Sequence, residues 1–289
     1  MFRAGTVLAL LAWLGVAANA AQQPARGTNA AETIAKVGTR VVEWYARAQS
    51  IVSTEDVRIT PLRYDMSPAE SARRLSYELR VAWEADGARP DVLPEPTILR
   101  SPLTVNGRPP RPGSDPGCMD PKPVTPEPLM MFLPGKREEF IFTHAGTARI
   151  DGRLAVTIDY KSILSGKPDI EWTKECVSVS LPGRTYGRVW IDPSNFDVLR
   201  LDEHLSGLFE FNVPREQQRL GAPSSMAIER SDSSIRYRRV QFHDPEDTLM
   251  LPAEVETTTV VRGGGTRRTR ISQRFSAYRR FITDVRMLP

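Results

Sequence analysis

The sequence contains few of the residues on which metal sites and most hydrolases depend. It has two cysteines and three histidines among 289 residues. The histidines, His144, His204 and His243, are dispersed, and none has the HExxH or HxH spacing that places two ligands on one metal ion. There is no GxSxG motif and no glycine-rich loop leading into a helix. We therefore expect no metal, no cofactor and no catalytic residue that the sequence can identify.

Long apolar runs are also lacking, with one exception at the N-terminus. The run over residues 7–18 is about a dozen residues long, whereas a helix that spans a bilayer needs roughly 20. Arg3 precedes the run and the small residues Ala18-Asn19-Ala20 end it, which is typical of a cleaved secretory signal peptide. We expect a signal peptide over residues 1–20, a disordered tether over 21–28, and a periplasmic or secreted mature protein without a membrane span.

Both cysteines, Cys118 and Cys176, follow the expected cleavage site. In an oxidising compartment an even number of cysteines favours a disulfide. A bond between them would close a loop of about 58 residues and stabilise the fold by roughly 4 kcal/mol in the chain-entropy model. The alternative is a metal-binding or catalytic thiol, but neither cysteine belongs to a CxxC motif or a cysteine–histidine cluster. A structural disulfide is the preferred interpretation.

One segment has the apolar period of a helix. Asn29 can cap it, and Glu32 stands three residues later, in the spacing of a capping box. Apolar residues then recur every three or four positions up to Ala48. This pattern predicts one amphipathic helix over residues 29–49. Its broad apolar face needs another surface to cover it.

Almost everything after this helix has the two-residue alternation of strands. Over residues 75–83 apolar and polar side chains alternate strictly, as in an antiparallel sheet with one buried face. Turn dipeptides such as Asn106-Gly107 and Asp151-Gly152 separate further strands. We expect residues 209–232 to be irregular, and strands to return beyond them and to end with 281–287.

About ten strands and one long helix are expected, without the alternation of strands and helices that a parallel α/β fold requires. The predicted fold class is mainly β with a small helical part (α+β). Ten consecutive antiparallel strands would curl into a curved sheet or an incomplete β-barrel. The amphipathic helix would then pack on the concave side of this sheet.

A proline-rich stretch interrupts the strands. Residues 109–128 contain eight prolines, which cannot support a helix interior or a central strand, so an extended surface loop is expected. Cys118 lies within this loop, and a disulfide would attach the loop to the strand that contains Cys176. The loop is either functional or a spacer that proline makes rigid.

Positive charge is concentrated near the C-terminus, although the chain has a formal net charge of only +4. Residues 262–289 contain eight arginines and one acidic residue, Asp284. One interpretation places the arginines on the wet faces of two strands, where they prevent edge-to-edge association. The other makes them a contact surface for anionic envelope components. The candidates for that surface are Arg267, Arg268, Arg270, Arg274, Arg279 and Arg280. A single arginine- and glycine-rich turn in an exported protein does not indicate nucleic-acid binding.

The inward side chains of a curved sheet face one shared space. Candidates to line it are aromatic and branched residues of the helix and of several strands, namely Trp44, Tyr77, Trp83, Phe140, Phe142, Val156 and Ile158. The same residue types would form an ordinary packed core. A cavity remains an alternative to that core because one helix has to cover about ten strands.

Parts of the sequence resemble known exported proteins. The order of a signal peptide, one amphipathic helix and a long antiparallel sheet resembles the lipoprotein-carrier-like (LolA-like) group of bacterial proteins. More narrowly, residues 130–142, 149–153, 187–193 and 275–281 resemble a group of uncharacterised secreted proteins. The resemblance implies a single half-barrel domain over residues 29–289, lined with apolar residues, which relatives use to hold acyl chains or to sense envelope lipoproteins. No single residue here matches the arginine that carriers place in the cavity.

Three functional hypotheses follow. The first is a non-enzymatic periplasmic protein that binds an apolar or lipid-like ligand, such as a lipoprotein acyl chain, in a half-barrel cavity. The second is a structural or interaction module with a filled core, whose proline-rich loop or arginine surface contacts another envelope protein. The third and least favoured is a hydrolase whose catalytic residues the sequence does not display.

Overall fold

The structure is a computed structural model of the chain. It describes residues 30–48, 50–69, 71–82, 97–111, 127–172, 177–243 and 246–280. Several predictions fall outside these residues: the signal peptide over 1–20, the tether over 21–28, Trp83, both cysteines (Cys118 and Cys176), most of the proline-rich loop over 109–128, and the last expected strand over 281–287.

The described residues form two α-helices, two short 3-10 helices and thirteen strands. The helices are α1 (Ala30–Arg47), η1 (Glu127–Phe132), η2 (Arg137–Glu139) and α2 (Arg215–Arg219). The strands are β1 (Ser50–Pro61), β2 (Arg73–Ala82), β3 (Thr97–Val105), β4 (Phe140–Ile150), β5 (Arg153–Ser162), β6 (Asp169–Trp172), β7 (Val177–Ser180), β8 (Thr185–Ile191), β9 (Val198–Leu205), β10 (Phe209–Asn212), β11 (Ser225–His243), β12 (Glu246–Arg262) and β13 (Thr266–Arg280).

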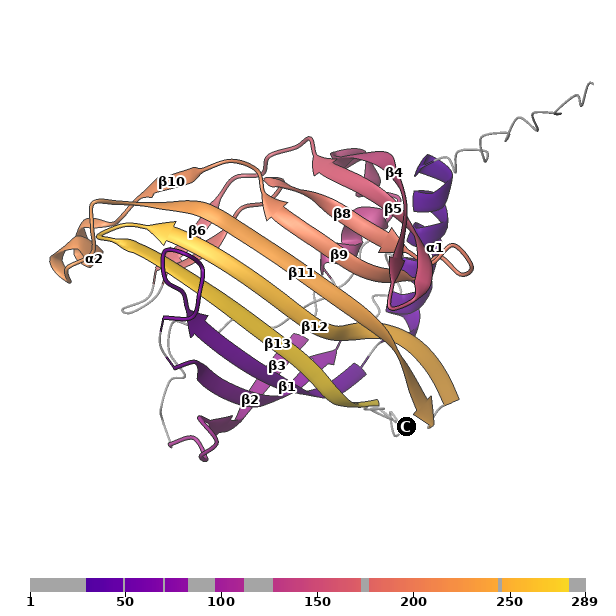
Figure 1. Ribbon diagram of the computed structural model, residues 1–289, viewed down its shortest axis with the longest axis horizontal. Coiled ribbons are helices and arrows are strands. Elements are labelled where there is room, and N and C mark those ends of the chain that lie inside the picture. The colour runs from indigo at the N-terminus through magenta and orange to yellow at the C-terminus, as the bar shows by residue number, and fades with distance from the viewer. Residues whose placement is uncertain are drawn as a thin grey trace, which may run out of the picture.

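Eleven of these strands form one antiparallel sheet, and β6 and β7 form a separate pair. The strand order in the large sheet is β3-β2-β1-β13-β12-β11-β9-β8-β5-β4, with β10 paired to β11 (Figure 1). Since this order begins at β3 and ends at β4, the sheet is open. The predicted fold class, a curved antiparallel sheet or incomplete β-barrel with an N-terminal helix, is confirmed.

Helix α1 has the amphipathic pattern that the sequence predicts. Its buried apolar residues are Ile34, Val37, Val41, Trp44 and Tyr45, with Ala48 just beyond the helix. On its exposed side Lys36 and Glu32 form an i,i+4 ion pair at 2.8 Å. Glu32 in the first turn and Arg47 in the last complement the helix dipole. The structure therefore bears out a helix over nearly the whole predicted range.

The core identifies the face of the sheet on which α1 lies. One cluster of buried residues includes the apolar side of α1, Leu79 and Val81 of β2, and Val156 and Ile158 of β5. Strands β2 and β5 lie near opposite ends of the strand order. Only a sheet that curves around α1 brings both ends to the same cluster, so α1 occupies the concave side. Burying each large apolar side chain there contributes about 1.5–3 kcal/mol.

Both turn dipeptides adopt the conformation that their sequences favour. Asp151 and Gly152 have φ values of 48° and 78°, and they join β4 to β5. Asn106 and Gly107 have φ values of 50° and 76°, directly after β3. Positive φ at two successive residues matches the right-handed twist of the strands, which explains why Asn-Gly and Asp-Gly mark these sites.

The expectation of an irregular segment over residues 209–232 is wrong. This segment contains β10, the short helix α2 and the first part of β11. Phe209 and Phe211 are buried on one face of β10, which pairs with β11. The first half of β11 is polar and partly buried, and it is a strand because β12 pairs with it along most of its length. Long-range pairing of this kind leaves no local alternation for a sequence pattern to detect.

Candidate functional site

The candidate site is the concave side of the sheet where α1 and η1 cover it. Five of the seven predicted lining residues meet there. Trp44, Val156 and Ile158 belong to the main core cluster, and Phe140 and Phe142 pack against it. The Phe142 ring lies 6.0 Å from the ring of Phe132 and 6.1 Å from that of Phe140, within the range of favourable aromatic pairs. These side chains contact one another across the site.

Tyr77 does not share this location. It is buried in a second apolar cluster with Val57, Ile59 and Leu75, farther along β1 and β2. Tyr77 is two and four residues from Leu79 and Val81 of the main cluster, so all three lie on the concave face of β2. The concave side therefore has two apolar regions, and only one of them lies under α1.

A small void lies between α1 and the sheet in the part of the chain that the structure describes. It has a volume of about 30 Å³ and is lined by residues that include Val41, Trp44, Leu129 and Tyr237. That volume is close to what one water molecule needs. An acyl chain does not fit there in this arrangement of the described residues. The indole nitrogen of Trp44 donates a hydrogen bond of 2.7 Å to the carbonyl oxygen of Met250, which also fixes the helix to β12.

Segment η1 supplies much of the filling. Its buried residues are Leu129, Met131 and Phe132, and Leu133 follows them. Phe132 is fully buried. The backbone of η1 rests directly on α1 at Gly38, where a Cβ atom would lie 2.4 Å from the carbonyl oxygen of Phe132. The absence of a side chain at Gly38 therefore allows the backbone of η1 to pack directly against α1.

A charged group lies on the concave side between the two apolar regions. Glu55 of β1 stands opposite Tyr77 of β2 and is fully buried. Arg100 of β3 binds it with two hydrogen bonds, from Nε at 2.8 Å and from Nη2 at 3.0 Å. Gln273 of β13 donates a third at 2.8 Å, and the Arg100 guanidinium lies 3.9 Å from the centre of the Tyr77 ring. Strands β1, β2, β3 and β13 are thus joined by one polar network.

This network was not predicted from the sequence, although one signal was present. In β1 the positions that face the core include Val57 and Ile59, and Glu55 occupies the same face of the alternating strand. A carboxylate at an apolar position of a strand needs a cation or several donors nearby. The sequence indicates the need but not the partner, since Arg100 is 45 residues away.

A second acid on the concave side has weaker partners. Glu203 lies on the same face of β9 as the buried Leu201. Tyr160 directs its hydroxyl toward Glu203, at 3.3 Å, and donates to the carbonyl oxygen of Asp202 at 3.2 Å. Burial raises the pKa of Glu203, although hydrogen bonds from Tyr160 and Thr185 act in the opposite direction. The tyrosine fits only because residue 187 is glycine, where a Cβ would lie 2.8 Å from the Tyr160 oxygen.

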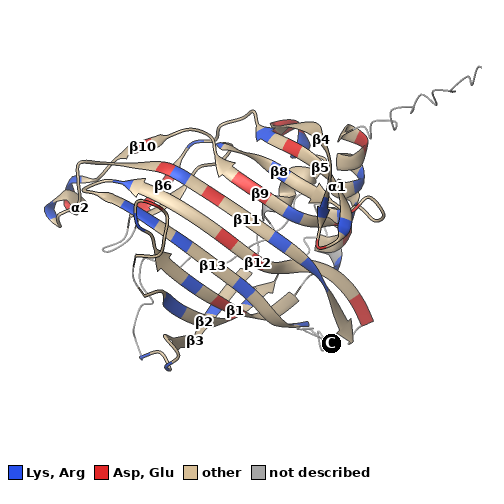
Figure 2. Ribbon diagram, viewed as in Figure 1, with Lys and Arg blue, Asp and Glu red and all other residues tan. Residues whose placement is uncertain are grey.

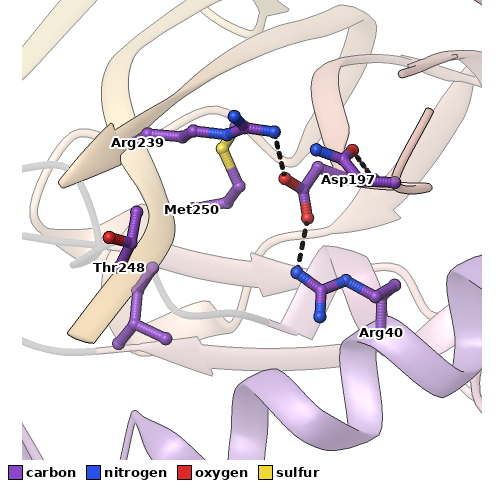
Figure 3. A pocket seen from close by; sticks show the side chains of 7 residues that line it. Arg40, Asp197, Arg239, Thr248 and Met250 are labelled. Atoms are coloured by element: carbon purple, nitrogen blue, oxygen red, sulfur yellow. Dashed lines mark hydrogen bonds and ion pairs between the residues drawn. The ribbon is translucent and has the colours of Figure 1, made fainter. Parts of the chain in front are cut away.

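A second hollow beside α1 is mainly polar. It has a volume of about 310 Å³ and is lined by Arg40, Asn195, Asp197, Arg239, Thr248, Leu249 and Met250. The guanidinium groups of Arg40 and Arg239 approach the Asp197 carboxylate from opposite sides (Figure 3). The N···O distances are 3.1 Å to Arg40 and 3.2 Å to Arg239. We call this hollow the arginine pocket.

The turn between β8 and β9 holds Asp197 in place. The backbone N–H of Asp197 donates to the side chain of Asn195 at 3.0 Å, and the N–H of Asp192 donates to the Asp197 carbonyl at 2.9 Å. Phe196 has a φ of 61°, and the ammonium group of Lys36 lies 4.9 Å from the centre of its ring. The role of this turn in positioning Asp197 was not predicted from the sequence.

The C-terminal arginines lie among acidic residues (Figure 2). Four of the six candidates have acidic partners: Arg270 with Glu256 at 3.8 Å, Arg274 with Glu254 at 3.1 Å, Arg279 with Glu78 at 3.2 Å, and Arg280 with Asp247. Arg268 lies over the ring of Tyr64 at 5.2 Å, and Arg267 is exposed. The positive charge of this surface is therefore partly neutralised by its neighbours. Contact with anionic envelope components stays a prediction.

Histidine and acidic side chains are the residues from which a metal site or a hydrolase site would be built. In the described part of the chain a histidine–carboxylate pair, His204 with Asp232 at 2.8 Å, joins β9 to β11, and the ring of Tyr186 lies 5.2 Å from the imidazole. Among the described residues no group of three histidine, cysteine or acidic side chains is placed to hold a metal ion. No described helix is both long enough and apolar enough to cross a membrane.

Solved structures of LolA-like proteins are similar to this chain. A DUF1329 family protein from Desulfovibrio piger matches with a TM-score of 0.42 and 10% identity, covering 90% of this chain and 96% of that one. A domain from Vibrio parahaemolyticus named for outer membrane lipoprotein sorting matches with a TM-score of 0.37 and 10% identity, over 88% and 95% of the two chains. A LolA superfamily protein from Nitrosomonas europaea matches with a TM-score of 0.33 and 11% identity, over 90% and 95%. No protein-family model and no curated protein matches the sequence.

Proposed function

We propose that the protein is a non-enzymatic, exported binding module that holds an apolar or lipid-like ligand on the concave side of its half-barrel. The ligand takes the place that η1 occupies in this structure. The observation that carries this proposal is the position of η1: a short 3-10 segment packs between α1 and an open sheet through the apolar side chains of Leu129, Met131 and Phe132.

The side chains of η1 and the residue after it are suited to exchange with a ligand. Leu129, Met131, Phe132 and Leu133 are all apolar and buried. These four side chains carry no N–H or O–H group, so their removal breaks no hydrogen bond that such a group would donate, and the loss of such bonds is what makes opening a polar core expensive. Together they contain about as many non-hydrogen atoms as a long-chain fatty acid, so the exchange conserves buried apolar volume. Methionine side chains adapt readily to different neighbours.

Helix α1 is fixed more firmly than η1. Its Trp44 is bonded to Met250, Arg40 pairs with Asp197, and Arg47 pairs with Asp247 at 2.9 Å. These contacts join the helix to β12, to the β8–β9 turn and to the β11–β12 hairpin. The helix therefore stays in place as one wall of the site while η1 moves.

Uptake of a fluorescent fatty acid by delipidated protein tests the proposal. We expect saturable binding of one ligand per protein. Gly38→Ala places a methyl group against the carbonyl oxygen of Phe132 and so weakens the packing of η1 on α1. A ligand that displaces η1 should then bind more tightly, by about tenfold for each 1.4 kcal/mol by which η1 packing is weakened. Gly135→Ala is the matched control, because a Cβ there meets nothing within 4 Å.

The proposal is wrong if neither the natural protein nor Gly38→Ala takes up fatty acid and no lipid copurifies with the protein. The small volume of the void under α1, about 30 Å³, favours a second function in that case. The protein would then be an interaction module with a filled core, which contacts another envelope protein through its surface. Crosslinking in the envelope would recover that partner, and Gly38→Ala would leave the recovery unchanged at temperatures where the protein is folded.

A further inference from the structure

We propose that the arginine pocket is a binding site for a phosphate group, next to the apolar site under α1 and η1. The pocket shares Arg40, Asp197 and Met250 with the small void under α1. Its donors are the guanidinium groups of Arg40 and Arg239, which Asp197 holds in position. The test of phosphate binding at this site does not depend on whether the protein binds a fatty acid.

The distribution of charge favours an anion on the open side of the pocket. Arg40 and Arg239 share the Asp197 carboxylate, and Arg40 also pairs with Glu43, so these four side chains carry no net charge, but Glu43 does not line the pocket. Asp197 is only 8% exposed, whereas the two arginine side chains are 36% and 45% exposed. The negative charge is thus buried behind its partners, and the positive charges face the open side. An anion is the complementary guest for such a surface.

The two arginines also have hydrogen-bond donors that a ligand can use. Arg239 uses one Nη atom to bind Asp197, which leaves further N–H groups of its five for a ligand. Arg40 uses Nη1 for Glu43 and Nη2 for Asp197, and its buried Nε has no hydrogen-bond partner among the described residues. Guanidinium groups bind phosphate oxygens in pairs of parallel hydrogen bonds, which favours arginine over lysine at phosphate sites.

The size and the lining of the pocket also fit a phosphate group. The pocket has a volume of about 310 Å³, roughly ten times the share of one water molecule in the liquid. That is more than a phosphate ion needs and leaves space for an attached glycerol group. Thr248 provides a hydroxyl group on the side of the pocket away from Asp197, and Leu249 and Met250 provide apolar contacts (Figure 3). The ligand is thus a phosphate carried by a small organic group or by a lipid head group.

The residues that bind or orient the phosphate group are held in place by secondary structure and by hydrogen bonds. Asp197 is held by the β8–β9 turn through Asn195 and Asp192. Arg40 belongs to α1, and Arg239 stands opposite Met250 in the β11–β12 pair. Donors that are already oriented lose little entropy when they bind a ligand.

Calorimetric titration at low ionic strength tests the site with two probes, inorganic phosphate and glycerol 3-phosphate. We expect saturable binding to the full-length protein. Arg239→Gln should weaken it by about tenfold or more, because one set of charge-assisted hydrogen bonds is lost. Asp197→Asn should strengthen it several-fold, because the carboxylate that competes for both arginines becomes neutral. A residue with a merely structural role would not produce these opposite changes.

Arg274→Gln is the matched control, since it removes the same charge from an exposed ion pair on β13. Flotation with phosphatidylglycerol vesicles, against phosphatidylcholine vesicles, separates the two sources of phosphate. Flotation that Arg239→Gln abolishes and Arg274→Gln preserves assigns a lipid head group. Binding of glycerol 3-phosphate without flotation assigns a small solute. The site is refuted if neither probe binds, or if Arg239→Gln and Arg274→Gln weaken binding equally.

Discussion

Two carboxylates on the concave side of the sheet have opposite surroundings. Glu55 accepts three hydrogen bonds, two from Arg100 and one from Gln273. Glu203 has hydroxyl groups as its main partners, and burial raises its pKa. A cation beside a buried carboxylate favours its charged form, whereas burial by itself favours the neutral form. The two residues should therefore respond differently to substitution.

Removing Arg100 should strongly destabilise the protein. Arg100→Met leaves Glu55 buried without its cation, and breaking a buried pair in this way costs about 3–5 kcal/mol. The double variant Glu55→Gln with Arg100→Met should recover part of that loss, because the amide is neutral and still faces Gln273. Urea unfolding measures both. Equal destabilisation by the single and double variants would show that Glu55 does not depend on Arg100.

Replacing Glu203 should stabilise the protein at neutral pH. The pKa of Glu203 is raised in the folded state. The stability that Glu203 contributes to the folded protein is therefore fully present below its unfolded-state pKa, and it is lost as the pH rises through its folded-state pKa. Glu203→Gln is uncharged at every pH, like the neutral acid, and its amide oxygen can still accept a hydrogen bond from the Tyr160 hydroxyl.

The melting temperature of Glu203→Gln should therefore exceed that of the natural protein at pH 7, by roughly 2–4 °C for each kcal/mol of cost removed. The difference should disappear near pH 4. A variant that is less stable than the natural protein at pH 7 contradicts this assignment.

At the scale of elements, the contact between α1 and η1 reverses the usual effect of a helix substitution. Gly38→Ala in the middle of a helix ordinarily stabilises it by about 1 kcal/mol. Here the new methyl group would lie 2.4 Å from the backbone oxygen of Phe132, so the substitution should instead destabilise the protein, by about 1–3 kcal/mol. Thermal unfolding beside Gly135→Ala measures the effect. A higher melting temperature for Gly38→Ala would mean that η1 does not rest on this residue.

Elements with a local signal could be predicted from the sequence, and those without one could not. Helix α1 and strand β2 have uninterrupted apolar periods, and the structure places both close to the predicted bounds. The first half of β11 has no such period, because its side chains are partly buried on both faces. Strand β10 is four residues long and acquires its register only from β11.

At the scale of the whole molecule, the sheet is joined by pairings that the sequence does not display. Strand β13 lies between β1 and β12, so residues near opposite ends of the chain, such as Ile51 and Arg280, become neighbours. The same holds for the site. The apolar lining residues followed from strand alternation, whereas Arg40 and Asp197 are 157 residues apart and meet only through the topology. Their types gave no signal, because single charged residues are common on exposed surfaces.

The distribution of apolar and polar groups over the molecule supports a division of tasks. The side of the half-barrel under α1 is apolar and filled by η1. The arginine pocket lies next to this site, between the β8–β9 turn and the β11–β12 hairpin, and shares Arg40, Asp197 and Met250 with the small void under α1. If a ligand displaces η1 as we propose, this arrangement suits a molecule with an apolar tail and an anionic head.

The most direct test of the account is hydrogen exchange of residues 127–133 with and without bound palmitate. Displacement of η1 predicts that these amides exchange faster in the complex, while amides of β5 and β8 remain as protected as before. Binding of palmitate with unchanged exchange at 127–133 would place the ligand elsewhere and contradict the proposed site.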